Sequence, residues 1–264
     1  MYRVLNLTHS DLDGICAALA IRETHNHPNE HVTTIFCTYA DINRQLVYGL
    51  TEKEAPYDRI ILTDISWQPP HKDRDLYKDH EERMLVEYYI PEAISNYRGD
   101  LVLIDHHERA SQLVSSFGTY LHEQSIVEIQ NEHGQRYAGS DLAARYYNKN
   151  SNVPEFRQIL MSHICRLTGD FDVWRDPLGY GGMLAMGTDI MKDPRGALDS
   201  LTEAFNRLYM WGLANNQRLR DEDLERFIKP TALGIYTETA KQMFENEVKK
   251  AMGTAIWHST KITE

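Results

Sequence analysis

Short apolar, β-branched runs alternate with longer helical stretches over the first two-thirds of the chain. Ile60-Ile61-Leu62 and Leu101-Val102-Leu103-Ile104 are continuous apolar runs, which is typical of strands covered on both faces. The alternation predicts an α/β fold in which a parallel, Rossmann-like sheet is flanked by crossover helices. The expected strands are Tyr2–Leu7, His31–Tyr39, Arg59–Asp64, Leu101–Asp105 and, on a weaker pattern, Ser125–Gln130.

Four helices are expected between and after these strands. They are Gly14–Thr24, Asp73–Tyr97 with an interruption at Pro91, Asp141–Asn148 capped by Ser140, and a helix that begins near Pro154 and carries Phe156, Ile159, Leu160, Ile164 and Leu167. The glycine-rich segment Leu178–Gly182 and Pro194 predict loops. Gly179-Tyr180-Gly181-Gly182 lacks the spacing of a dinucleotide-binding loop, so no nucleotide cofactor is inferred.

The pattern changes near residues 187–197. Beyond them lie two long, charged, amphipathic segments, Leu198–Ile228 and Thr237–Met252. We therefore expect an α/β domain over residues 1–190 and a helical linker or cap over residues 191–264.

Composition and charge limit the kinds of function that this chain can have. Hydrophobic residues make up 42% of its 264 residues, enough for a buried core. With 28 Lys and Arg against 39 Asp and Glu, the net charge is −11, which argues against a protein that coats duplex nucleic acid. An enzyme that captures a short anionic substrate through bound metal ions remains compatible with this charge.

Apolar runs and cysteines indicate the compartment. The longest apolar stretch, Ile15–Ile21, is far shorter than the roughly 20 residues that span a bilayer, so no membrane association is expected. The segment from Met1 to Asn6 leads directly into a strand and does not resemble a secretory signal. Cys16, Cys37 and Cys165 are odd in number and widely spaced, which predicts free thiols and a cytoplasmic protein.

Acidic residues and histidines follow three of the predicted strands. The segments are Thr8-His9-Ser10-Asp11-Leu12-Asp13-Gly14, Thr63-Asp64-Ile65 and Asp105-His106-His107. Ligands of parallel α/β sheets bind at the carboxyl ends of the strands, so these side chains are expected to converge there. Carboxylates so close together repel one another, and bound cations are the economical explanation. Carboxylate and imidazole ligands without thiolate favour Mn²⁺, and Mg²⁺, Fe²⁺ or Co²⁺ are also compatible.

Each segment also has an ordinary structural interpretation. Asp11-Leu12-Asp13-Gly14 can be a turn followed by a helix cap, Asp64 can cap whatever follows its strand, and two of twelve histidines can be adjacent by chance. Their coincidence at one edge of the sheet favours a site. A carboxylate that bridged two cations would place them about 4 Å apart, an arrangement suited to phosphoryl chemistry.

These segments resemble the first three motifs of the DHH phosphoesterase superfamily. The matching residues are Thr8-His9-Ser10-Asp11-Leu12-Asp13-Gly14, Leu62-Thr63-Asp64 and Leu103-Ile104-Asp105-His106-His107, and a fourth motif is similar to Gly169-Asp170-Phe171-Asp172-Val173-Trp174. The forms HNDLDG, TD, IDHH and YDTW of the NrnB-like nanoRNase branch resemble this set most. The resemblance covers about residues 1–190 and implies two-metal hydrolysis of phosphodiester bonds.

The resemblance also implies a role for each residue. Asp11 would bind the first metal, Asp13 the second, and Asp64 would bridge the two. His106 and the aspartate of the fourth motif would bind the second metal; the Asp-x-Trp frame favours Asp172 over its competitor Asp170. Asp105 would orient the histidine pair, and His107 would contact the scissile phosphate. His9 is a further candidate ligand, although it stands closer to the first aspartate than its counterpart does in the pyrophosphatase branch. Arg109 is either a phosphate contact or a solvated arginine.

One family feature is not found in the sequence. DHH nucleases usually carry a DHHA1 domain with a glycine-rich loop that ends in histidine, and no Gly-Gly-Gly-His sequence occurs here. We expect this domain to be missing or truncated, and a smaller cap, a homo-oligomer or a partner to supply the substrate clamp. The expected substrate is a short oligoribonucleotide or a small phosphate ester, attacked as by a 3′–5′ exonuclease or nanoRNase. A phosphodiesterase of cyclic dinucleotides or other small nucleotides and a non-catalytic DHH scaffold are the alternatives.

Overall fold

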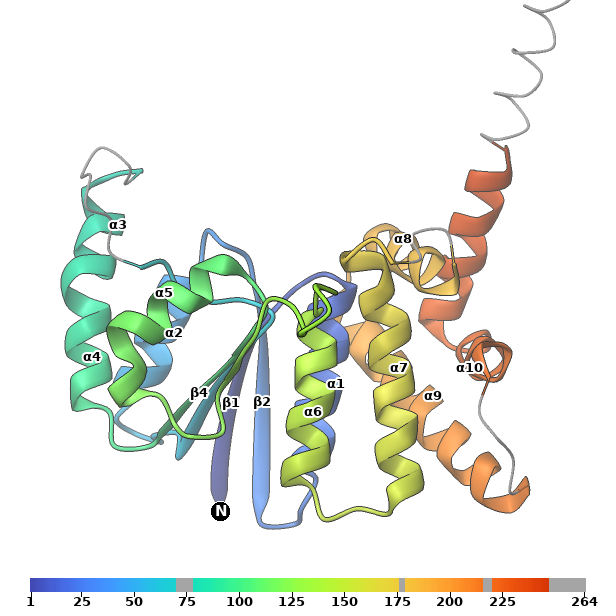
Figure 1. Cartoon of the computed structure of the whole chain (residues 1–264), viewed down its shortest axis with the longest axis horizontal. Coiled ribbons are helices and arrows are strands. Elements are labelled where there is room, and N and C mark those ends of the chain that lie inside the picture. The colour runs from blue at the N-terminus through green and yellow to red at the C-terminus, as the bar shows by residue number, and fades with distance from the viewer. Residues whose placement is uncertain (70–77, 176–178, 216–219, 247–264) are drawn as a thin grey trace, which may run out of the picture.

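The computed structural model describes residues 1–69, 78–175, 179–215 and 220–246 (Figure 1). Five parallel strands form one sheet in the order β2-β1-β3-β4-β5. The strands are β1 Tyr2–His9, β2 Glu30–Cys37, β3 Arg59–Thr63, β4 Asp100–Asp105 and the two-residue β5 Ile126–Val127. The predicted α/β fold is confirmed, although β5 is shorter than the expected Ser125–Gln130.

Helices cover both faces of the sheet (Figure 1). One face carries α2 Ile42–Thr51, α4 Ile90–Asn96 and α5 Glu108–Phe117, followed by the 3₁₀ turn η3 Gly118–Tyr120. The other face carries α1 Leu12–Thr24, α6 Gly139–Asn150 and α7 Glu155–Asp172. Because successive side chains of a strand point to opposite faces, Val4 joins one core and Leu5 joins the other. This burial on both faces explains the continuous apolar runs in the sequence.

The C-terminal helices pack on the same core as α1. They are α8 Tyr180–Met191, α9 Pro194–Asn215, α10 Asp221–Ile228 and the helical residues 232–246. Leu201 and Phe205 of α9 are buried in the hydrophobic cluster that also contains Ile15 of α1. The division into two domains near residue 190 stays a prediction. No helix in the described parts of the chain has the length and hydropathy needed to cross a membrane.

The segment before β4 corrects the expected helix Asp73–Tyr97. Residues 70–77 lie outside the described ranges, and the helical region consists of α3 His80–Met84, a π-helical turn η2 Leu85–Tyr89 and α4. Pro91 stands at the start of α4 and does not break the helix. A proline has no N–H to donate and clashes with the carbonyl four residues earlier, and the wider turn just before it accommodates both effects.

Three further helix starts differ from the prediction. Gly181 and Gly182 lie inside α8 instead of in the predicted loop. A Cβ atom at Gly181 would come within 2.1 Å of the Leu167 carbonyl oxygen, so the glycine allows α8 to pack closely against α7. Pro194 is the first residue of α9, a position that tolerates its missing N–H. At α6 the N-cap is Ala138, and Ser140 lies within the first turn.

The three cysteines are free thiols, as expected, and all are buried.

Gly14 fixes the close approach of β1 to the start of α1. A Cβ atom at this position would lie 2.4 Å from the backbone oxygen of His9, which cannot move without distorting the end of β1. Thr8 donates its hydroxyl to the Gly14 carbonyl at 2.7 Å and holds the two segments together. The loop that carries Asp11 and Asp13 therefore depends on the absence of a side chain at Gly14.

We expect Gly14→Ala to lower the free energy of unfolding by about 2 kcal/mol, because overpacking against backbone cannot be relieved by a rotamer change. Gly118→Ala is the matched control, since its Cβ would find only Val114 Cγ1 at 3.9 Å and its φ is −55°. Urea unfolding of both variants measures the difference. Equal stability of the two variants would contradict this account of the loop.

Candidate metal centre

The candidate site lies at the carboxyl edge of the sheet, where the loops after β1, β3 and β4 come together. The C-terminal end of α7 and the N-terminal end of α6 reach the same edge, as ion pairs and hydrogen bonds to the loop residues show. Side chains far apart in the sequence thereby become neighbours. The candidate residues are His9, Asp11, Asp13, Asp64, Asp105, His106, His107 and Asp172.

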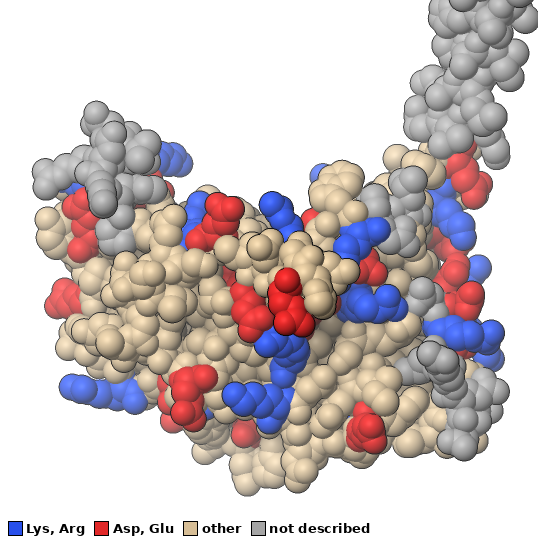
Figure 2. Space-filling model, viewed as in Figure 1, with Lys and Arg blue, Asp and Glu red and all other residues tan. Residues whose placement is uncertain are grey.

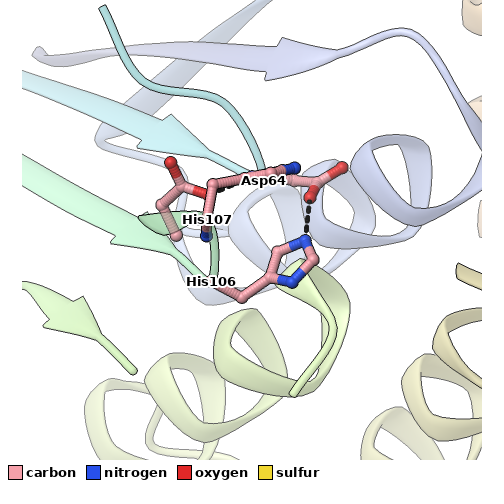
Figure 3. A group of neighbouring side chains, drawn as sticks. Asp64, His106 and His107 are labelled. Atoms are coloured by element: carbon pink, nitrogen blue, oxygen red, sulfur yellow. Dashed lines mark hydrogen bonds and ion pairs between the residues drawn. The ribbon is translucent and has the colours of Figure 1, made fainter. Parts of the chain in front are cut away.

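Asp64 ends β3 in a left-handed backbone conformation with φ of 55°. Such a conformation is unfavourable for a residue with a Cβ atom and persists only where the surroundings enforce it. Here the Asp64 N–H donates to the carbonyl of Ile104 at 3.0 Å, and Gly139 packs so closely that a Cβ atom there would lie 2.5 Å from the Asp64 Cβ. His106 Nε2 lies 3.1 Å from Asp64 Oδ1 (Figure 3).

Asp11 performs the structural role expected of a helix cap and also faces the site. Its Oδ1 accepts from the Gly14 N–H at 3.0 Å, which caps α1, and its Oδ2 lies 2.6 Å from His9 Nδ1. The hydrogen bond to Asp11 raises the pKa of His9. Burial opposes the ionisation of Asp11, but this pairing with His9 holds its pKa below the ordinary value. The capping and site interpretations of this segment are therefore both compatible with the geometry.

Asp13 is buried and is held by the first turn of α6. Its two oxygens accept from the N–H groups of Gly139 at 2.6 Å and Ser140 at 3.1 Å, and from the Ser140 hydroxyl. The positive end of the helix dipole adds to these bonds. Ser140 therefore binds Asp13 from inside the helix instead of capping α6 as predicted.

The structure separates the two aspartates of the fourth motif. Asp172 Oδ2 lies 3.6 Å from His106 Nε2, within the candidate site. Asp170 lies 2.8 Å from Arg175 Nε and 3.9 Å from Arg166 Nη1, in an ion-pair network outside it. The geometry favours Asp172 as the aspartate that faces the site.

Asp105 is hydrogen-bonded to one member of the histidine pair, His107. Its Oδ1 lies 2.7 Å from His107 Nδ1 and accepts from the His107 N–H at 3.2 Å. His106 is held instead by Asp64 and Asp172. The described hydrogen bonds thus join Asp105 to His107, and the expectation that Asp105 orients both histidines stays a prediction. The buried Asp105 Oδ2 has no hydrogen-bond partner in the described structure.

Three carboxylates of this site, unlike Asp11, have raised pKa values. Burial raises the pKa of Asp13 to about 7, and the charges of Asp172 and Asp11 add to the rise. Burial likewise raises the pKa of Asp64 well above its ordinary value, and the charges of Asp13, Asp11, Asp105 and Asp172 add to the rise. Burial also raises the pKa of Asp172. No lysine or arginine is among the described groups that shift the pKa of Asp13 or Asp64, so these carboxylates repel one another when they are ionised.

The pKa values of His106 and His107 are shifted in opposite directions. Burial, together with the neighbouring His107, lowers the pKa of His106. Burial acts in the same direction on His107, but its hydrogen bond to Asp105 outweighs this effect and raises the pKa. His106 therefore tends to be neutral, the form in which an imidazole nitrogen can bind a metal.

Three overlapping groups of these side chains can hold a metal ion. Within each group, one ligand atom per residue lies within 4.8 Å of the others. The first group is His9, Asp11 and Asp64, and the second is Asp13, His106 and Asp172. The third group is Asp64, Asp105, His106 and His107. Oxygen and nitrogen donors without sulfur suit Mn²⁺, Mg²⁺ or Fe²⁺. The unbalanced negative charge and the unpartnered Asp105 oxygen also fit a cation site.

Sequence patterns contain no signal for three of the neighbouring residues, Tyr39, Gly139 and Ser140. Tyr39 lies just beyond β2, with its hydroxyl oxygen 3.2 Å from His107 Nε2. Gly139 and Ser140 approach the site only because α6 packs there, which no local motif reveals. Arg109 is the candidate phosphate contact of the sequence analysis. Its guanidinium carbon lies 5.2 Å from the centroid of the Tyr39 ring, and the structure describes no contact between Arg109 and the carboxylates.

Comparisons with known proteins identify a shared fold. The structure is similar to that of an uncharacterized protein from Helicobacter pylori G27, with a TM-score of 0.51 and 17% identity over 91% of this chain and 69% of that one. An exonuclease RecJ bound to manganese gives a TM-score of 0.41 at 10% identity, over 96% of this chain and 65% of that one. RecJ from Thermus thermophilus in complex with Mn²⁺ gives 0.38 at 12%, over 94% and 37%. No protein-family model and no curated protein matches the sequence.

We expect the metal-free protein to be less stable at pH 8 than at pH 6. The raised pKa values of Asp13, Asp64 and Asp172 mean that the folded state binds protons more tightly, so stability falls as pH rises toward about 7. Protonated His9 and His107 act in the same direction, because their raised pKa values add stability that is lost as pH rises. His106, with a lowered pKa, opposes them.

Thermal unfolding in a chelator at the two pH values measures this effect. Mn²⁺ added at pH 8 should raise Tm by at least about 3 °C, the shift that about 1 kcal/mol produces in a chain of this size. A monovalent salt at matched ionic strength is the control, and Mg²⁺ serves as a second test cation. A Tm that rises from pH 6 to pH 8 in chelator would contradict the charge balance described above.

The separation of Asp172 from Asp170 predicts different effects on metal affinity. Asp172→Asn should weaken Mn²⁺ binding at least about tenfold, because it removes an ionised ligand from the site. Asp170→Asn should leave the affinity within about twofold, since Asp170 is held by arginines outside the site. Titration with Mn²⁺ followed by electron paramagnetic resonance measures both. The opposite ranking would make Asp170 the ligand of the fourth motif.

Proposed function

We propose that this protein is a metal-dependent phosphodiesterase of the DHH type that hydrolyses short oligoribonucleotides. The observation that carries the proposal is the convergence of Asp11, Asp13, Asp64, His106 and Asp172, which the sequence scatters over more than half of the chain. Three of the four segments resemble the first three DHH motifs, and the fourth, which carries Asp172, resembles the fourth motif. The NrnB-like branch is part of this proposal and is supported by motif form alone.

The ligand groups support a site for two cations. Asp64 belongs to the group with His9 and Asp11, and it lies 3.1 Å from His106 of the group with Asp13 and Asp172. Divalent cations, when bound, lower the pKa of water and neutralise charge that develops on phosphoryl oxygens. Mn²⁺ is the proposed metal. Asp13 would be presented by the first turn of α1 and oriented by the first turn of α6, and Asp64 would be presented by the turn that follows β3.

Other residues of this chain would handle the substrate. His107 is fixed by Asp105 and is turned toward Tyr39 at the rim of the site, where its Nε2, when it carries a proton, can donate to an oxygen of a phosphate ester. Arg109 follows in the first turn of α5 and adds a positive charge on the same side. Asp105, with its buried carboxylate, would hold the tautomer of His107 and would not touch the substrate.

Charge favours a substrate with few phosphates. Figure 2 shows acidic and basic side chains intermixed on the face that it presents, without a continuous basic stripe among the residues described. Together with the net charge of −11, this surface repels a long polyanion. A di- to pentanucleotide needs only the metal site and a few nearby donors.

The proposal predicts that purified protein with Mn²⁺ hydrolyses 5′-labelled RNA of two to five nucleotides and that chelation abolishes the reaction. Asp64→Asn should lower kcat at least about 100-fold, because it removes the carboxylate shared between the ligand groups. Asp170→Asn is the matched control and should retain most of the activity. A cyclic dinucleotide, pyrophosphate and a 20-mer serve as competing substrates.

Each result of this assay has a distinct meaning. Preferred turnover of the cyclic dinucleotide would replace the oligoribonuclease by a cyclic-dinucleotide phosphodiesterase at the same site. Mn²⁺ binding without turnover of any substrate would indicate a non-catalytic scaffold. Turnover that survives Asp64→Asn would show that the assigned residues do not carry the reaction.

A further inference from the structure

Tyr39 connects two groups that the proposed function assigns to the substrate. It lies in the loop between β2 and α2, and its side chain is 45% exposed. Its hydroxyl oxygen is 3.2 Å from His107 Nε2, and its ring meets the His107 ring edge-on at an interplanar angle of 87°. The Arg109 guanidinium carbon lies 5.2 Å from the centroid of the Tyr39 ring.

The hydroxyl of Tyr39 completes the fixation of His107. Asp105 Oδ1 occupies the other ring nitrogen, Nδ1, at 2.7 Å. A carboxylate only accepts hydrogen bonds, so Nδ1 carries a proton. The Tyr39 hydroxyl can donate to Nε2 when the ring is neutral and accept from the Nε2 proton when the ring is charged, so the contact persists in both forms. Because both ring nitrogens are engaged, rotation of His107 about its side-chain bonds breaks at least one hydrogen bond.

The ring of Tyr39 has a second role toward Arg109. A guanidinium stacked on an aromatic face within about 6 Å is attracted by the ring electrons, and this attraction does not occupy its N–H donors. Arg109 therefore keeps its donors for an anion while it is held near His107, two residues earlier in the chain. Burial raises the pKa of Tyr39 to about 12, so the hydroxyl stays protonated at neutral pH.

We infer that Tyr39 is a positioning residue that holds His107 and Arg109 together in the orientation needed to receive the oxygens of a phosphodiester. The inference rests on the proposed function and deepens it, because it identifies the corner formed by Tyr39, His107 and Arg109 as the place where the substrate phosphate is recognised. Changing Tyr39 leaves in place Asp11, Asp13, Asp64, His106 and Asp172, the side chains to which the proposed function assigns the metals.

Tyr39→Phe tests the hydroxyl alone, since the ring and its stacking on Arg109 remain. We expect kcat for an RNA dinucleotide with Mn²⁺ to fall about tenfold while KM changes less than about threefold, because His107 is present but no longer fixed. Tyr39→Ala also removes the platform under Arg109 and should raise KM in addition. Tyr120→Phe, an equally exposed tyrosine at the far end of α5, is the control and should leave both constants unchanged.

A spectroscopic measurement separates this inference from the proposed function. In full-length protein freed of metal by a chelator, ¹⁵N NMR of the histidine rings should show a shift of the His107 Nε2 signal in Tyr39→Phe but not in Tyr120→Phe. An unchanged signal, or a Tyr39→Phe variant with wild-type kcat, overturns the role of Tyr39. If the wild-type protein hydrolyses no phosphodiester while the signal shifts as expected, the hydrogen bond stands and the proposed function fails.

Discussion

Repulsion among buried carboxylates is the constraint on which the rest of this structure depends. Asp11, Asp13, Asp64 and Asp172 act on one another's ionisation, and the residues described place no lysine or arginine beside Asp13 or Asp64. The fold opposes this repulsion with fixed dipoles, since the first turn of α6 donates two N–H groups to Asp13. A bound cation would neutralise these charges. Relief of the repulsion among the carboxylates would then contribute to the binding free energy of the ion.

The backbone around the site is shaped by the same requirement. Asp64 adopts a left-handed conformation so that its carboxylate turns away from the direction of β3 toward His106. Gly139 is needed opposite it, because any side chain there would collide with Asp64. The left-handed conformation of Asp64 and the absence of a side chain at Gly139 therefore depend on each other.

Much of this arrangement can be predicted from the sequence, and the reason is periodicity. The apolar runs before Asp64 and Asp105 reveal buried parallel strands, and parallel strands bring their carboxyl ends to one edge. Tyr39 and Ser140 could not be predicted, because their contacts depend on how a loop and a helix pack in three dimensions. The choice between Asp170 and Asp172 depends on the last turn of α7, where a difference of two residues decides which carboxylate faces His106 and which meets Arg175.

Ser140 has one hydroxyl proton and two neighbours that can accept it. Its oxygen is hydrogen-bonded to Asp13 Oδ1 and lies 2.9 Å from the carbonyl oxygen of Cys165. When Asp13 is ionised the hydroxyl donates to it; when Asp13 is neutral, the carboxylic acid donates to the serine, which turns its own hydrogen toward the carbonyl. A rotation of one O–H bond would therefore keep Asp13 hydrogen-bonded in either protonation state without moving a heavy atom of the protein interior, whether or not a cation were bound beside it.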